Sequence, residues 1–260
     1  MEIIREVSIT DNDIYAMSIS KDYIIINYNY MGLRLYDKEL KFVKDIVFSQ
    51  ELIVYSVYTS ILNNNVVIID AENSKLYILI IGIDNYELLE INQDNVFSEY
   101  FMVENSNFLL AKENIVYKYS YKTGNLINTY VMQDRSIIFN CQNEFLFRRN
   151  NKIFYKRNCV EYLLAYEYRE GVFYKVFNEV FVEYDESKLK IYRKTNLIDT
   201  YLCEESFIIR TVDYCEGRII VLLNKKSILN VSTICQIKIW AEKKRRDEKV
   251  RASIGSSENN

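Results

Sequence analysis

The sequence contains no histidine, and this absence excludes several kinds of chemistry. Catalysis by Ser-His-Asp or Cys-His arrangements needs an imidazole base, so this chain can build neither of them. Metal sites with histidine ligands are excluded for the same reason. The cysteines include no CxxC pair, so the ligand spacing typical of a zinc site is missing as well.

The five cysteines are too few and too irregularly placed for a disulfide scaffold. They are Cys141, Cys159, Cys203, Cys215 and Cys235. The number is odd, and four of them lie within or beside apolar runs, which indicates small buried thiols in a reducing compartment. The glycine-rich patterns GxGxxG and GxxxxGK[ST] do not occur either, so the sequence predicts no phosphate-cradling loop and no cofactor.

Charge and hydrophobic runs are also limited. The net charge is −3, which gives no bulk attraction to nucleic acid or to an anionic membrane. The longest apolar run, residues 76–83, is much shorter than the roughly 18 residues of a membrane-spanning helix. The first residues lack a basic region followed by an apolar core, so we expect no signal peptide. These features predict a soluble intracellular protein, cytoplasmic or nuclear.

The sequence is rich in residues that favour strands, and these residues recur with a period of roughly 40. There is no proline, and 23 of the 260 residues are tyrosine. Each unit has a loose apolar stretch, a nearly continuous apolar run, an alternating strand and, in five of six cases, a fourth strand. The alternating strands lie at 33–37, 75–81, 115–121, 152–156, 188–192 and 236–240. The clearest internal match is NLINTYV at 125–131 with NLIDTYL at 196–202.

Four-stranded units of this length are typical of a β-propeller. A small sheet with two apolar faces cannot bury both faces alone, and radial stacking buries each face against a neighbouring sheet. We therefore predict an all-β propeller with six four-stranded blades, in a single domain over residues 1–242. Seven blades, with a further unit within 84–104 or 224–235, and an all-β sandwich are the alternatives.

The ends of the chain complete this prediction. The sixth unit lacks a fourth strand, and residues 1–10 form a lone strand ahead of the first unit. We predict that this strand pairs antiparallel with the last strand and closes the ring. Burial of Ile3, Ile4, Val7 and Ile9 there would contribute at most about 6 to 12 kcal/mol. Residues 243–260 are predicted to form a charged tail, helical at first and then disordered.

The third strands resemble those of WD40 repeats, which typically end in Trp-Asp. LRLYD at 33–37 and IKIW at 237–240 carry the likeness, although Ala241 and Glu242 follow Trp240 and the usual Gly-His pair is absent. The resemblance implies a rigid platform that binds other proteins on its top face or rim, usually without catalysis. Our main hypothesis is therefore a non-enzymatic scaffold or complex subunit whose partners are one or more proteins.

A basic segment supports an alternative function. FRRNNKIFYKR at 147–157 is similar to the Phe-Arg-Arg-Gly motif of phosphoinositide-binding propellers, whose paired arginines contact lipid phosphates, although the glycine is missing. A hairpin turn at 150–151 would bring its charges together on one blade. The segment then predicts a module that binds phosphoinositide or nucleic acid. Solvated turn charges are the other interpretation. The candidate residues are Arg148, Arg149, Lys152, Lys156 and Arg157.

Two further sets of charged residues are candidates. Lys243, Lys244, Arg245 and Arg246 form a basic run that predicts either a partner-binding or nuclear-import segment or a solubilising tail. Asp70, Glu183 and Asp185 lie near strand ends, where a pair of carboxylates could serve a hydrolase. Acidic residues in ordinary turns are the simpler explanation for these three.

Overall fold

The computed structural model of the protein describes most of the chain as β-strands joined by turns, and all statements below concern the described part. It comprises residues 2–10, 14–28, 32–48, 52–70, 72–83, 85–91, 100–103, 106–112, 114–131, 136–141, 144–157, 160–165, 167–177, 180–193, 196–226 and 235–241. None of these residues forms a helix long and apolar enough to cross a membrane.

The strands form six four-stranded antiparallel sheets, three of them in the first half of the chain. One contains β2 (Met17–Ile19), β3 (Ile24–Tyr28), β4 (Gly32–Tyr36) and β5 (Phe42–Val47). The next contains β6 (Ser56–Thr59), β7 (Asn65–Asp70), β8 (Lys75–Ile81) and β9 (Tyr86–Ile91). The third contains β10 (Tyr100–Val103), β11 (Asn107–Lys112), β12 (Ile115–Ser120) and β13 (Leu126–Val131).

The second half of the chain forms the other three sheets. One contains β14 (Ser136–Cys141), β15 (Glu144–Arg149), β16 (Lys152–Arg157) and β17 (Val160–Ala165). The next contains β18 (Phe173–Phe177), β19 (Val180–Tyr184), β20 (Lys188–Arg193) and β21 (Asn196–Leu202). The last contains β22 (Phe207–Cys215), β23 (Arg218–Lys225), β24 (Cys235–Ala241) and, beside β24, β1 (Glu2–Ile9).

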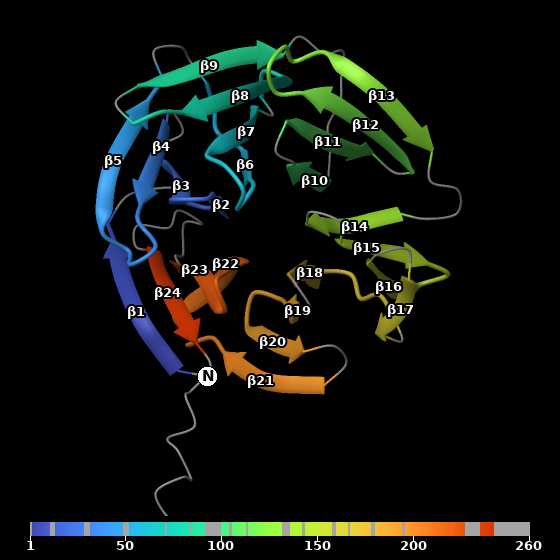
Figure 1. Cartoon of the computed structure of the whole chain (residues 1–260). Helices are drawn as coiled ribbons and strands as arrows, with labels where there is room; N and C mark the ends of the chain where they lie inside the picture. Colours follow the sequence, from blue (N-terminus) through green and yellow to red (C-terminus); the bar gives the residue numbers. More distant parts are fainter. Residues whose placement is uncertain are drawn as a thin grey trace, which may run out of the picture.

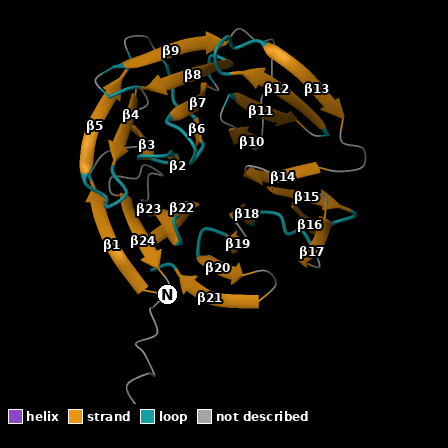
Figure 2. Cartoon of the chain, in the orientation of Figure 1, coloured by secondary structure: helices purple, strands orange, loops and turns teal. Residues whose placement is uncertain are grey.

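The sheets stand around a common centre (Figure 1). The first strand of each sheet is innermost: β2 contacts β6 and β22, β10 contacts β6 and β14, and β14 contacts β18. The fourth strand lies at the rim, and no helix is drawn in the described part of the chain (Figure 2). The prediction of an all-β propeller is therefore confirmed.

The second strand of each sheet is nearly continuous in apolar residues because both of its faces are covered. In β3, Ile24 and Ile26 pack into one cluster with Leu222 of β23, and Ile25 packs into another with Ile68 of β7. All three isoleucines are fully buried. Since successive side chains of a strand point to opposite faces, one run of isoleucines joins two intersheet cores.

β1 pairs antiparallel with β24, with Val7 opposite Ile237 and Glu2 opposite Ala241. The prediction that four aliphatic side chains of β1 are buried is wrong. Only Ile9 is buried, whereas Ile3 is 45% exposed. Ile4 and Val7 are partly buried against the core. The register shifts between Ile3 and Arg5, and this bulge leaves Ile3 at the rim.

Candidate functional site

The basic segment 147–157 forms the hairpin of β15 and β16, as predicted. Asn150 and Asn151 occupy the turn with φ values of 49° and 61°. Two successive residues with positive φ are typical of the tight turns that join twisted antiparallel strands, and asparagine tolerates this conformation better than other residues with a side chain. The turn is therefore set by these two asparagines.

The register of this hairpin divides the five basic residues between two faces of the sheet. Arg149 lies opposite Lys152, and Arg148 lies opposite Ile153. Because opposed residues share a face and successive residues alternate, Arg149, Lys152 and Lys156 belong to one face. Arg148 and Arg157 belong to the other. The hairpin therefore brings the five charges onto one sheet. Arg148 and Arg149 point to opposite faces of that sheet, so a single phosphate cannot contact both of them.

Arg149 is engaged by its own sheet. Its Nη1 lies 3.3 Å from Oε2 of Glu161 on β17. Its guanidinium lies 4.3 Å from the ring centroid of Phe154, within the range of a cation–π contact. Lys156 also lies opposite Glu161 in the pairing of β16 with β17. A carboxylate thus balances part of the positive charge on this face.

Arg148 on the other face is exposed and lies over an aromatic ring. Its guanidinium is 5.0 Å from the ring centroid of Tyr168. Tyr168 belongs to the connection that leads to β18, and its N–H donates a 2.7 Å hydrogen bond to the carbonyl of Asn151. The hairpin turn therefore supports the loop that leads into the next sheet.

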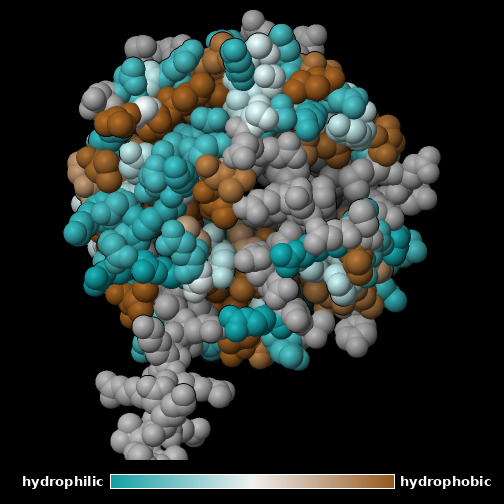
Figure 3. Space-filling view, in the orientation of Figure 1, coloured by the Kyte–Doolittle hydropathy of each residue, from teal (hydrophilic) through white to brown (hydrophobic). Residues whose placement is uncertain are grey.

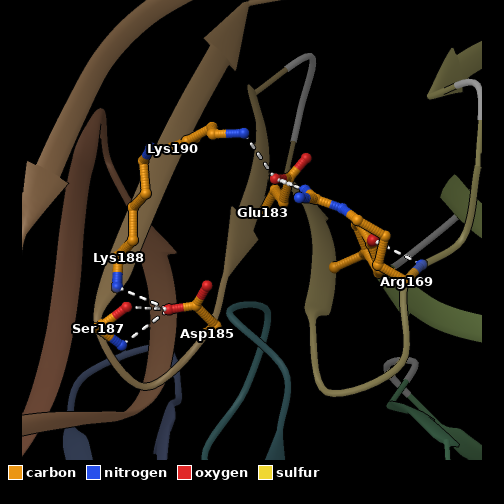
Figure 4. Close-up of polar contacts among 7 residues, drawn as sticks. Arg169, Glu183, Asp185, Ser187, Lys188 and Lys190 are labelled. Carbon is orange, nitrogen blue, oxygen red and sulfur yellow. Dashed lines mark hydrogen bonds and ion pairs between the residues drawn. The ribbon is translucent and has the colours of Figure 1, made fainter.

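That loop ends in an ion-pair cluster, shown in Figure 4. Glu183 on β19 is buried, and its carboxylate contacts the Arg169 guanidinium and, at 2.9 Å, the Lys190 Nζ. The hydrogen bond to Glu183 raises the pKa of Lys190. Burial opposes the charge of Arg169, but Glu183 and Tyr174 outweigh it and raise its pKa. Two cations around one buried carboxylate hold the loop on the sheet.

The other two predicted carboxylates also stabilise local structure. Asp185 Oδ1 accepts hydrogen bonds from the Ser187 N–H, the Ser187 hydroxyl and the Lys188 N–H, at 2.7 to 2.9 Å (Figure 4). Burial acts in the opposite direction, but these bonds lower the pKa of Asp185. Asp70 is fully buried in another sheet and accepts from Asn73 and from the Ile53 N–H. Asp185 is thus bound within its own turn, and Asp70 holds both its turn and the segment that precedes β6.

The sequence analysis missed a polar junction where three sheets meet. Asp213 on β22 accepts a 3.1 Å hydrogen bond from the Ile19 N–H of β2 and a 2.8 Å bond from the Tyr214 N–H. Lys175 of β18 donates to the Val212 carbonyl at 2.7 Å. Burial raises the pKa of Asp213, although the charge of Lys175 lowers it in part. In the sequence, the one feature that could have indicated this junction is the acidic residue Asp213 within a run that otherwise has the pattern of a strand.

A second polar junction ties β1 to its surroundings. Glu39, in the turn between β4 and β5, accepts hydrogen bonds from Arg218 at 2.7 Å and from Arg5 at 3.2 Å. The bonds from Arg218 and Arg5 lower the pKa of Glu39. One carboxylate therefore connects β1, β23 and the first sheet.

Lys243, Lys244, Arg245 and Arg246 lie outside the described residues, as does the whole predicted tail. Cys203 and Cys215 are free thiols. Within the described part of the chain, no three Cys, Asp or Glu side chains are grouped so that they could hold a metal ion.

The rim of the molecule exposes large apolar side chains (Figure 3). They lie mainly on the fourth strands of the sheets. They include Phe42, Val43 and Val47 on β5, Leu126, Ile127, Tyr130 and Val131 on β13, Val160, Tyr162 and Leu163 on β17, and Leu197, Ile198 and Leu202 on β21. Such exposure is unusual for a surface that faces only water.

Comparison with known proteins adds a likeness in fold. No family model and no curated protein matches the sequence. Among solved structures, the Swd1 (Cps50) β-propeller domain of Myceliophteria thermophila is similar, with a TM-score of 0.53 and 10% identity over 89% of this chain and 84% of that one. Hsv2 of Kluyveromyces lactis is similar too, with a TM-score of 0.51 and 8% identity over 82% of this chain and 73% of that one. At these identities the likeness establishes the fold alone, which is that of a β-propeller.

Proposed function

We propose that this protein is a non-enzymatic, intracellular, WD40-like propeller that binds other proteins as a scaffold or complex subunit. The observation that carries the proposal is the row of exposed apolar side chains on the outer strands. Exposed apolar surface costs free energy in water and is commonly retained where a partner covers it. Tyrosines such as Tyr130 and Tyr162, which are about half exposed, are enriched at protein interfaces.

The charged residues support the same proposal by elimination. Glu183, Asp185 and Asp70 are each occupied by hydrogen bonds that hold a turn or loop. Paired catalytic carboxylates need free oxygens that face a substrate between them. Here the oxygens of all three carboxylates are engaged by local structural contacts, which argues against that role. The rigid strands instead provide a fixed surface for a partner.

Affinity capture of the full chain at low salt, from cells that express it, tests this function. We expect proteins to co-purify with the wild type, and to be lost from a rim variant in which Tyr162 and Leu197 are replaced by lysine. Both replaced residues are exposed, so the rim variant should keep the wild-type melting temperature. The proposal fails if nothing co-purifies, or if the rim variant captures the same proteins.

Phosphate binding through the basic hairpin is a second candidate function. Arg148 and Lys152 are exposed, and Arg148 already lies against Tyr168, which would hold its guanidinium in place. Phosphate groups bind arginine through charge-assisted hydrogen bonds. Phosphatidylcholine vesicles with and without a phosphoinositide, and a single-stranded RNA, distinguish the two phosphate sources. Binding that weakens with salt and is lost in Arg148→Ala/Arg149→Ala would support this function, and unchanged binding would contradict it.

We also infer that the propeller ring has six blades and is closed by the β1–β24 pairing. The grouping of the strands into six sheets supports the blade count. The seven paired positions of β1 with β24 and the Glu39 junction support closure by the first residues of the chain. Truncation of β1 tests this inference, as described below.

A further inference from the structure

One outer strand differs from all the others in charge. β13 is the last strand of its sheet, so one side of its backbone is free of sheet pairing. All six of its residues, Leu126–Val131, are exposed, and none of them is charged. Every other outer strand carries charge: Glu2, Arg5 and Glu6 on β1, Lys44 and Asp45 on β5, Glu87 and Glu90 on β9, Glu161 on β17, and Asp199 on β21.

Charge matters at a sheet edge because the free N–H and C=O groups there can pair with another strand. Proteins commonly protect an edge with a charged side chain, which would have to be desolvated or opposed when a second strand adds. β13 lacks this protection along its whole length, and it offers four large apolar side chains in addition. It lies at the upper right of the rim in Figure 1.

β21 provides a matched comparison within the same molecule. Both strands have a bulge at the isoleucine that follows their first leucine, Ile127 in β13 and Ile198 in β21. In both, the residue after the bulge accepts a 2.8 Å hydrogen bond from the next N–H: Asn128 from Thr129, and Asp199 from Thr200. The two edges therefore share the bulge and this hydrogen bond, and they differ in charge at the equivalent positions Asn128 and Asp199.

We propose that the β13 edge binds a second copy of this chain by antiparallel pairing of β13 with β13; this inference rests on the proposed function as an interaction subunit. A two-fold axis places each strand opposite its own copy, so charges of a single sign on the strand approach like charges of the copy. An uncharged strand avoids this repulsion. Among the described outer strands, only β13 satisfies this condition for self-pairing.

The sequence of β13 also fits a particular register. With the two-fold axis at Asn128, this residue lies opposite its own copy, and Ile127 lies opposite Thr129 of the partner subunit. Aromatic and β-branched side chains form favourable cross-strand pairs. The Thr129 N–H then transfers from its own Asn128 side chain to a carbonyl of the second strand. A single strand pair buries less than the roughly 800 Å² per partner of a standard interface, so a weak dimer is expected.

Sedimentation velocity of the purified full chain, over roughly 1 to 200 μM, tests the proposal. The wild type should show a dimer that grows with concentration in this micromolar range, where weak self-association is observed. Asn128→Asp should weaken association by about tenfold, because the added carboxylates approach each other across the axis. Asn128→Ser, which adds no charge, should dimerise like the wild type.

The Asp variant should keep its fold, because Asp199 makes the same bond to the Thr200 N–H in β21. Equal melting temperatures for the three proteins verify this. A wild type that stays monomeric over the whole range, or an Asn128→Asp protein that dimerises equally well, overturns the inference. A monomer that still captures other proteins through the rim would overturn this inference and leave the proposed function standing. A wild type that dimerises through β13 but captures no other protein would support this inference and contradict the proposed function.

Discussion

At the scale of single residues, Asp213 is the most informative side chain. It lies where the inner strands β2, β18 and β22 meet, and its two oxygens accept backbone N–H groups from two different sheets. Its neighbours include Lys175 and Lys38, whose charges favour the ionised form, yet burial outweighs them and raises its pKa.

The raised pKa predicts how Asp213 affects stability with pH. A raised folded-state pKa contributes stability that is fully present below the unfolded pKa, near 3.8, and is lost as the pH rises through the folded value. In Asp213→Asn this part of the pH dependence should disappear. The variant should also lose about 1 to 3 kcal/mol at low pH, because an NH2 group, which cannot accept a hydrogen bond, replaces one of the two oxygens that accept the Ile19 and Tyr214 N–H groups. Urea unfolding at several pH values measures both effects.

Asp185→Asn is the control for this prediction. Hydrogen bonds from Ser187 and Lys188 lower the pKa of Asp185, so its contribution is present above its unfolded pKa and is lost only as the pH falls through the folded value. Asp185→Asn should therefore lower stability by a constant amount above that unfolded pKa and change the slope of the curve only on its acid side. An Asp213→Asn protein with the same pH dependence as the wild type would contradict the assignment.

At the scale of secondary-structure elements, β1 buries fewer of its apolar side chains than its sequence indicated. Ile9 is buried, Ile4 and Val7 are partly buried, and Ile3 faces solvent. Their burial corresponds to about 3 to 6 kcal/mol. Lys238, which is buried on β24, has Glu6 of β1 at 3.8 Å and Glu204 at 3.3 Å. The free energy of unfolding of a typical domain is about 5 to 15 kcal/mol, so the loss of this contribution could unfold the protein.

Deletion of residues 1–10 should therefore lower the free energy of unfolding by about 3 to 6 kcal/mol and expose the β24 edge, with aggregation as a consequence. Two point variants form the matched pair: Ile9→Ala should cost about 2 to 5 kcal/mol, and Ile3→Ala less than about 0.5 kcal/mol. Thermal and urea unfolding followed by circular dichroism measure these changes. Unaltered melting of the truncated chain would refute ring closure by β1.

Strand types were predictable from the sequence, whereas the partition of side chains between faces was not. The alternation in KIFYK and the continuous run in RIIVLL already distinguished half-covered strands from fully covered ones. The asparagine pair at 150–151 likewise predicted the turn. The sequence did not show that Arg148 and Arg149 point to opposite faces with different contacts, because it carries no information about which neighbours fill each face.

At the scale of the whole molecule, the two ends of the described chain meet in one sheet. Glu2 lies opposite Ala241 in an antiparallel pair. A two-residue Asn-Gly turn is sufficient to join such strands. A protein that links Ala241 to Glu2 in this way, omits residues 242–260 and begins at Asp11 would build every sheet from four consecutive strands.

This circular permutant should fold to the same strand content and melt within about 5 °C of the wild type, because it keeps every strand pair and only relocates the break. It should also tolerate dilution and mild denaturant at least as well, since the first and last strands are then covalently joined. Circular dichroism and urea unfolding measure both properties. A permutant that does not fold would contradict the inference that β1 belongs to the sheet of β24 in solution.

The sequence by itself determined the all-β class, the repeat of about 40 residues and the propeller fold, because these follow from periodicity and from the need to bury two faces of small sheets. Only the tertiary structure decided which charges are paired, that Asp213 lies where three sheets meet, and that every residue of the uncharged strand β13 is exposed. Those features depend on contacts between residues far apart in the chain. A local sequence pattern does not record such contacts.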